Sequence, residues 1–212
     1  MSRVERNMGS MMCRESVVAL LKQRILNRPD FLSTNNALLR GLAWLIVGTI
    51  AAWHLCLVPT SMLGYTADGY IPLIWHVALA LTMWIAYGVV YFALGVMLNR
   101  QATIVEIFGR LLFAHWPITL MLAPAIFINR VAYATYMSDV VVAFKIYPYD
   151  SIVMTIVAVI VVVWTLYWGY VAFRRAVQRN GVVMLVCYIV ATLAAYYLST
   201  LLLGALYRGI AW

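Results

Sequence analysis

Long apolar stretches alternate with short polar segments along most of this chain. Five of them come close to or exceed the roughly 20 apolar residues that a helix needs to cross the hydrocarbon core of a membrane. They run over residues 41–59, 71–98, 107–128, 151–173 and 182–206. Each predicts a membrane-spanning helix, because unpaired backbone groups are too costly in lipid. The pattern therefore predicts an all-α integral membrane bundle of five transmembrane helices.

A different pattern precedes the first span. In the segment Glu15–Arg28, apolar residues recur at helical spacing while Lys22, Arg24 and Arg28 lie around them. This pattern predicts an amphipathic helix on the anionic inner leaflet, with a docking helix for a protein partner as the alternative. We expect a basic N-terminal arm (1–40), a five-span domain (41–206) and a short external tail (207–212). The first long apolar run begins too late for a cleaved leader.

Composition supports a location in lipid. Of the 212 residues, 66% are hydrophobic and 10% are charged, whereas soluble domains carry about 25% charged residues. A water-soluble globule is therefore excluded.

The basic residues predict the orientation of the spans. Twelve of the fifteen lie before the first span, between spans two and three, or between spans four and five, and three lie on the other side. The positive-inside rule then places the N-terminus in the cytoplasm and the C-terminus outside. The aromatic residues 164–173 fit an interfacial belt at the inner end of span four, and the tyrosine-rich loop 129–150 is expected to lie against the outer membrane surface.

The predicted cytoplasmic basic residues form a candidate surface for anionic lipid headgroups or a partner, at about 1 kcal/mol each. The alternative is that they only set topology. The surface comprises Lys22, Arg24, Arg28, Arg100, Arg110, Arg174, Arg175 and Arg179.

A polar site near the outer face is a further candidate. His54 and His76 are predicted at the outer ends of spans one and two, with Asp68 in the loop between them, whereas His115 is predicted about one turn from the inner face. Ionisable groups inside a membrane are candidates for function, and a histidine bonded to a neighbouring helix is the alternative. Because the three histidines differ in depth, no shared metal site is expected.

Enzymatic signatures are missing from the sequence. It has neither HExxH nor Gly-x-Ser-x-Gly, no phosphate-cradling glycine loop and no CxxC pair. We therefore expect no enzyme, no cofactor, no metal and no nucleic-acid partner. No acidic residue lies deep in a predicted span, which disfavours transport coupled to protons or sodium.

Three stretches resemble the Yip family, the Ypt/Rab-interacting membrane proteins with a five-span domain and many bacterial relatives. The arm Leu20–Leu32 is similar to the short basic helix before the first span of bacterial members. The stretch Ala93–Pro124 resembles the central segment, with Pro117 at the position of the family's proline in span three. Trp164–Leu198 resembles the closing pair of spans with its basic elbow.

The chain also departs from that family. Residues 99–103, Asn-Arg-Gln-Ala-Thr, replace the glycine-rich turn that often follows span two, and the Asp-Leu-x-Gly-Pro signature of eukaryotic members is absent. Rab binding is therefore not carried over. The resemblance implies a non-enzymatic protein of the bacterial inner membrane that organises membrane or binds lipid or protein partners, a homo-oligomer included. The alternative is a small transporter or permease subunit with a polar site near His54 and His76.

Overall fold

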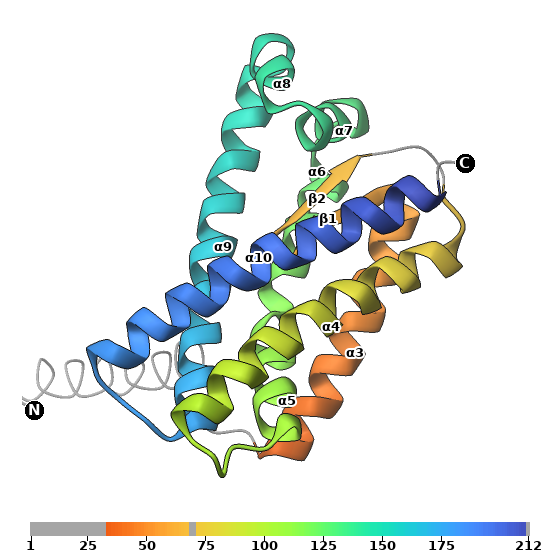
Figure 1. The fold of residues 1–212 in the computed structure, drawn as a ribbon. Coiled ribbons are helices and arrows are strands. Elements are labelled where there is room, and N and C mark those ends of the chain that lie inside the picture. Colours follow the sequence, from red (N-terminus) through yellow and green to blue (C-terminus); the bar gives the residue numbers. More distant parts are fainter. Residues whose placement is uncertain (1–32, 68–70, 211–212) are drawn as a thin grey trace, which may run out of the picture.

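The computed structural model describes residues 33–67 and 71–210 (Figure 1). The predicted amphipathic helix Glu15–Arg28, with Lys22, Arg24 and Arg28, and the loop residue Asp68 lie outside the described residues.

Within residues 33–67 and 71–210, five helical segments are long and apolar enough to cross a membrane. Four are continuous: α3 (Thr34–His54), α4 (Leu73–Leu98), α9 (Pro148–Val177) and α10 (Val182–Ile210). The remaining one, Ile104–Phe127, is the third in chain order. The predicted all-α membrane bundle is confirmed. The last helix runs into the region expected to be a short tail.

The third span is built from three pieces. It comprises α5 (Ile104–Ala114), the 3-10 helix η2 (Trp116–Leu122) and the single turn α6 (Pro124–Phe127). Pro117 and Pro124 lie in the first turn of the second and third pieces. A proline there needs no backbone donor of its own and interrupts the preceding helix, which explains both breaks.

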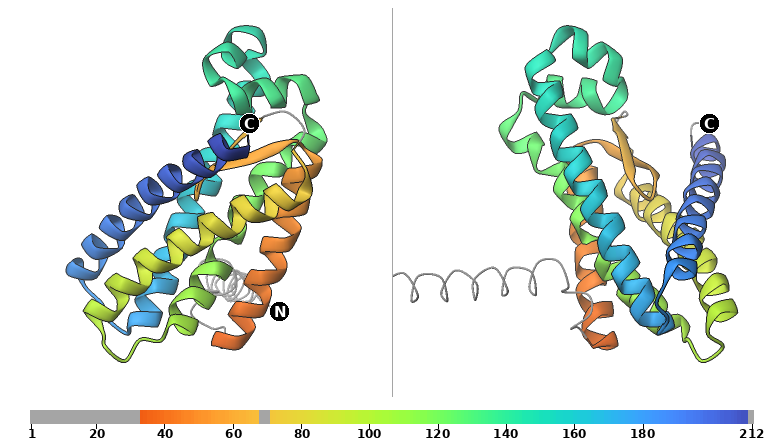
Figure 2. Two further views of the ribbon diagram at one scale, coloured as in Figure 1. Left: turned by 45° about the vertical axis from the view of Figure 1, so that its right-hand side comes forward. Right: turned by 90° about the vertical axis from the view of Figure 1, so that its left-hand side faces the viewer.

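The spans form two layers that diverge toward one end (Figure 2). The third span packs between α3 and α9 in one layer, and α4 packs along α10 in the other. Toward the diverging end, a two-stranded hairpin fills the space between the layers (Figures 1 and 2).

Glycines set the close approach of α3 to the third span. A Cβ atom on Gly41 would lie 2.8 Å from Leu112 Cγ and 2.8 Å from the backbone nitrogen of Phe113. A Cβ atom on Gly48 would lie 2.8 Å from Thr119 Cγ2. α3 therefore packs against the backbone of α5 at Gly41 and against the Thr119 side chain at Gly48, a close approach that small residues permit in membranes.

Aromatic side chains fill the middle of the bundle. Trp168 and Phe173 are almost fully buried, and the Trp168 ring stacks on Phe113 at 5.7 Å between centroids. An interfacial belt is therefore the wrong interpretation for these two residues. Both belong to the interior, because Trp168 packs against Phe113 of α5 and Phe173 packs against Tyr91 of α4 and Tyr188 of α10.

The hairpin consists of β1 (Leu57–Ser61) and β2 (Gly64–Ala67), paired antiparallel. It corrects the predicted first span, which was expected to continue to residue 59 and to include Cys56. The helix instead ends at His54, and Cys56 adopts a left-handed backbone with φ of 53°. The span begins earlier than expected, at Thr34, so it keeps its length.

Two short helices occupy the predicted outer loop. The side chains of Asn129 and Asp139 accept hydrogen bonds from the first turns of α7 (Arg130–Ser138) and α8 (Val140–Ile146). Both helices pack at the start of α9, beyond the hairpin (Figure 1). The loop is thus a helical cap on one end of the bundle.

Candidate functional site

The hairpin enters the bundle rather than covering it. Leu57, Val58 and Met62 are each at most 2% exposed, and the tip reaches His115 at the junction of α5 and η2. A hairpin satisfies most of its own backbone groups, which makes irregular backbone tolerable at this depth. Two carbonyl groups of the hairpin are bonded by side chains instead.

Two histidines bond to the hairpin, one at the start of β1 and one just after its end. His76 Nε2 lies 3.1 Å from the Leu57 carbonyl oxygen, and His115 Nε2 lies 2.8 Å from the Met62 carbonyl oxygen. Because a carbonyl oxygen only accepts, both Nε2 atoms donate, and each neutral imidazole keeps an acceptor lone pair on Nδ1. Both Nδ1 atoms are buried and have no hydrogen-bond partner among the described residues.

Both histidines line one cavity of about 40 Å³ between α3, the hairpin, α4 and the third span. Space of this size holds about three water molecules. Ser61 contributes a hydroxyl group, and Trp44, Trp84 and Trp116 contribute aromatic surface. The Trp84 and His115 rings meet edge to face at 5.2 Å between centroids.

The predicted trio of His54, His76 and Asp68 is placed differently. His76, the fourth residue of α4, lies near the end of its span as expected, but it is buried against Leu57. His54 ends α3 with an exposed side chain whose ring stacks on Trp53. His115 lies eleven residues into its span rather than one turn. The cavity therefore joins His76 with His115.

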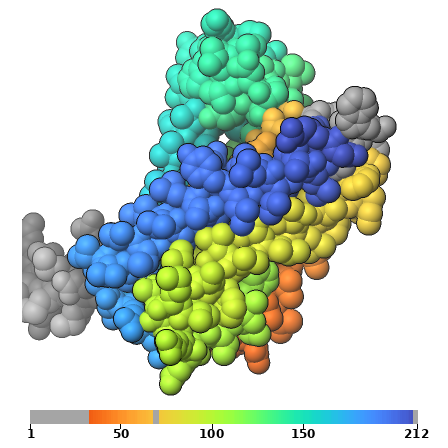
Figure 3. All heavy atoms as spheres, viewed as in Figure 1, coloured from red at the N-terminus to blue at the C-terminus, as the bar shows by residue number. Residues whose placement is uncertain are grey.

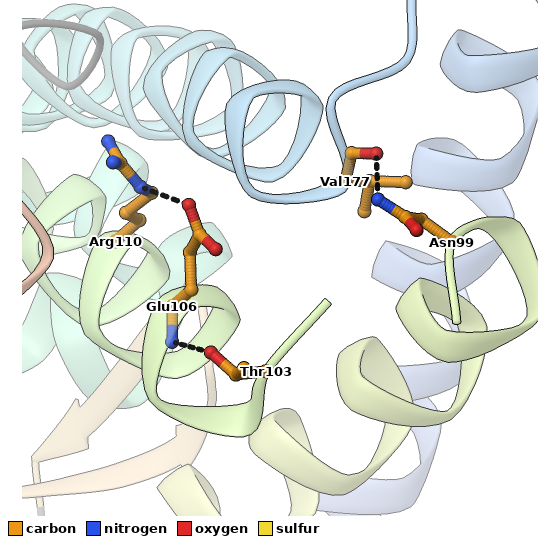
Figure 4. Close-up of polar contacts among 5 residues, drawn as sticks. All are labelled: Asn99, Thr103, Glu106, Arg110 and Val177. Carbon is orange, nitrogen blue, oxygen red and sulfur yellow. Dashed lines mark hydrogen bonds and ion pairs between the residues drawn. The ribbon is translucent and has the colours of Figure 1, made fainter. Parts of the chain in front are cut away.

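The two elbows that carry predicted basic residues meet at one end of the bundle. Asn99, which follows α4, donates from Nδ2 to the Val177 carbonyl at the end of α9, at 3.1 Å (Figure 4). This bond brings Arg100 near the end of α9, where Arg174, Arg175 and Arg179 lie. Arg100, Arg175 and Arg179 are exposed, and the Arg174 guanidinium lies 6.0 Å from the centre of the Tyr170 ring. We call these four residues the basic end.

Arg110 differs from the other predicted basic residues. Its side chain is 9% exposed and forms an ion pair with Glu106 at 3.6 Å, one helical turn earlier (Figure 4). Thr103 caps the same helix by accepting from the Glu106 amide. Arg110 is therefore part of the packed α5 surface and is not included in the basic end.

On its outer side the hairpin is tied to α7. The Thr66 hydroxyl donates to the Met137 carbonyl at 3.1 Å, which ties the hairpin to α7, and the Tyr133 hydroxyl donates to the Met121 carbonyl at 3.1 Å, which ties α7 to η2. Burial raises the pKa of the Tyr65 phenol to about 12. It also raises the pKa of Tyr133, with a smaller contribution from Tyr65.

A second cavity, of about 220 Å³, lies between the hairpin and the far half of α10. Val58, Leu203 and Gly204 line it together with three threonines. The space-filling view shows the surface hollowed beside the hairpin between α9 and α10 (Figure 3). α10 thus covers the hairpin incompletely.

Sequence reasoning missed the hairpin and the cavity that it closes. Pro59 and Gly64, with β-branched residues between and after them, are the signals that favour a strand and a turn. Among the described residues, no three His, Cys, Asp or Glu side chains come together as a metal cluster. No family model, curated protein or solved structure matches this chain.

Proposed function

We propose that this chain is a non-enzymatic integral membrane protein that binds anionic lipid headgroups at its basic end. The observation that carries the proposal is the hydrogen bond between Asn99 and Val177, which holds two basic elbows side by side. The Yip-like stretches support a role in organising membrane or binding a partner protein, at the bacterial inner membrane with the basic end in the cytoplasm. In that orientation the basic end faces the anionic leaflet.

The size of the effect follows from the number of exposed charges. A basic residue near an anionic membrane surface contributes about 1 kcal/mol. Arg100, Arg175 and Arg179 together then contribute about 3 kcal/mol, which corresponds to roughly a hundredfold preference for anionic over neutral lipid. The attraction is electrostatic and weakens as the salt concentration rises.

Charge neutralisation tests this proposal. The triple variant Arg100→Gln, Arg175→Gln, Arg179→Gln is compared with Arg130→Gln, Lys145→Gln, Arg208→Gln, which removes three exposed charges elsewhere. Lipid retention is measured by native mass spectrometry after extraction in equal mixtures of anionic and neutral lipid. We expect the first variant to lose most of the preference for anionic lipid and the second to keep it. Equal loss in both would refute binding at the basic end.

A small transporter or permease subunit is the second candidate, and the cavity beside His76 and His115 favours it. Transport requires this cavity to open to water at some stage. In a background lacking the three native cysteines, Ser61→Cys should then react with a small charged thiol reagent added to one side of sealed vesicles. A Ser61→Cys side chain that stays unreactive from both sides would count against transport through this cavity.

A further inference from the structure

The unpaired Nδ1 atoms of His76 and His115 are the least explained polar groups of the cavity. Both residues are at most 3% exposed, and leaving a buried acceptor unsatisfied is unfavourable. An imidazole whose Nε2–H donates to a backbone carbonyl is oriented as in most metal-binding histidines, with the other nitrogen free to coordinate. Each Nδ1 atom is thus oriented so that it can accept a hydrogen bond or coordinate a metal ion.

The two imidazoles lie at different ends of the cavity. Leu57 begins β1 and Met62 follows its last residue, and a strand that rises about 3.3 Å per residue separates Leu57 from Ser61 by roughly 13 Å. His76 also precedes Trp84 by eight residues of α4, about 12 Å along a helix, and His115 packs against Trp84. A single ion therefore does not bind both histidines, and each end has its own surroundings.

The end around His115 has a particular chemistry. Met62 and Met83 line the cavity together with Trp84 and His115. Met62 follows β1 and also supplies the carbonyl that orients the His115 ring, and Met83 precedes Trp84 on α4. Thioether sulfur combined with imidazole nitrogen is a soft, uncharged ligand set, which favours Cu(I) over hard cations such as Mg²⁺ or Ca²⁺.

Charge balance points to a monovalent ion. None of the described residues that line the cavity is Asp, Glu, Lys, Arg or Cys. A divalent cation would keep its full charge in a low-dielectric interior, and its desolvation would be very costly. The desolvation of a monovalent soft cation costs much less. The face of an indole ring such as Trp84 also attracts cations.

We propose that the His115 end of the cavity binds Cu(I), or its stable mimic Ag(I), through Nδ1 of His115 and the thioethers of Met62 and Met83, beside the Trp84 ring. Binding leaves the Nε2–H bond to the Met62 carbonyl in place, so the hairpin need not be displaced. The site is separate from the basic end and does not depend on lipid binding there.

Metal binding to the full-length protein in nanodiscs tests the proposal. The protein carries Cys13→Ser, Cys56→Ala and Cys187→Ala, so that thiols do not compete, and it is titrated with Ag(I) by calorimetry. Cu(I) is then added under anaerobic, reducing conditions, and X-ray absorption identifies its ligand atoms. We expect one tightly bound ion per chain, with both sulfur and nitrogen as ligands.

Matched variants assign the ligands. Methionine-to-leucine changes conserve volume and preserve packing. We expect Met62→Leu and Met83→Leu each to weaken Ag(I) binding at least about tenfold, a loss of about 1.4 kcal/mol, and the double variant to abolish it. Met97→Leu, at a side chain that is 80% exposed, should bind as the parent does. Absence of a tight site in the parent, or unchanged binding in the folded double variant, overturns the proposal.

Discussion

His115 Nε2 donates a hydrogen bond to the carbonyl oxygen of Met62, a residue 53 positions earlier in the chain, at 2.8 Å. The bond joins the tip of the hairpin to the break between α5 and η2. Neither the hairpin nor the break between α5 and η2 is continuous helix, and both lie inside the bundle. Loss of the bond should therefore affect the stability of the whole membrane domain.

Replacing the His115 ring tests the importance of this bond. His115→Phe keeps an aromatic ring but removes the donor, which leaves the buried Met62 carbonyl unpaired. We expect the free energy of unfolding to fall by about 1–3 kcal/mol, measured by denaturation with increasing mole fraction of sodium dodecyl sulfate. His54→Phe, at an exposed position, should change it by less than about 0.5 kcal/mol. Equal stability of the two variants would contradict a structural role for the bond.

Close packing of α3 on the third span predicts a second effect. Gly41→Ala places a methyl group 2.8 Å from a backbone nitrogen, so the helices must separate, at a cost of about 1–3 kcal/mol. Gly204→Ala meets nothing within 4 Å and should leave stability unchanged or raise it slightly. Thermal unfolding in nanodiscs compares the two variants, and a lower melting temperature for Gly204→Ala than for Gly41→Ala would be the opposite of this expectation.

Stability at high pH should depend on Tyr65. Its pKa is about 10 in an unfolded chain and about 12 in the folded protein. Below pH 10 the Tyr65 phenol is neutral in both the folded and the unfolded state, so its contribution to folding stability is fully present. As pH rises from about 10 to 12 the unfolded state loses its proton first, so this contribution to stability is lost. Tyr65→Phe should show a smaller loss over this interval in denaturation curves, whereas exposed Tyr149→Phe should behave like the parent.

Orientation in the membrane is open to direct test. In the cysteine-free background, Gln101→Cys and Gln178→Cys lie on the two elbows joined by Asn99 and Val177, so both should be labelled from the same side. Tyr149→Cys, at the start of α9, should be labelled from the other. An impermeant maleimide is applied to intact cells and to inverted vesicles, and the labelling shows which side of the membrane each cysteine faces. The positive-inside rule predicts that the elbows are cytoplasmic, and labelling of the elbows in intact cells would reverse the topology.

The apolar pattern predicted the five spans because hydrophobic length is a property of the sequence itself. It also placed His76 near the end of its helix. It failed at residues 55–59, which were assigned to the first span, because Leu55, Leu57 and Val58 fit a continuing helix as well as a buried strand. Periodicity does not separate a short buried strand from a helix end, so only Pro59 and the following Gly64 favour the strand and the turn here.

Long-range contacts were beyond the reach of the sequence pattern. Asn99 and Val177 are 78 positions apart, and only the fold brings the two elbows together. Likewise, the expected depth of His115 assumed a span that begins near residue 107, whereas α5 begins at Ile104 and continues through Glu106 and Arg110. Pairing between Glu106 and Arg110 at 3.6 Å reduces the cost of placing these two charges within the helix.

The position of the hairpin has a consequence for how the protein is made. A ribosome releases the hairpin before His76, well before His115, and long before the residues of α10, such as Leu203, that pack around Val58. At that stage its carbonyl groups lack their partners, and exposing them to lipid would be costly. We therefore expect the hairpin to remain on the aqueous side of the membrane during synthesis and to enter the bundle only after the last helix has been inserted.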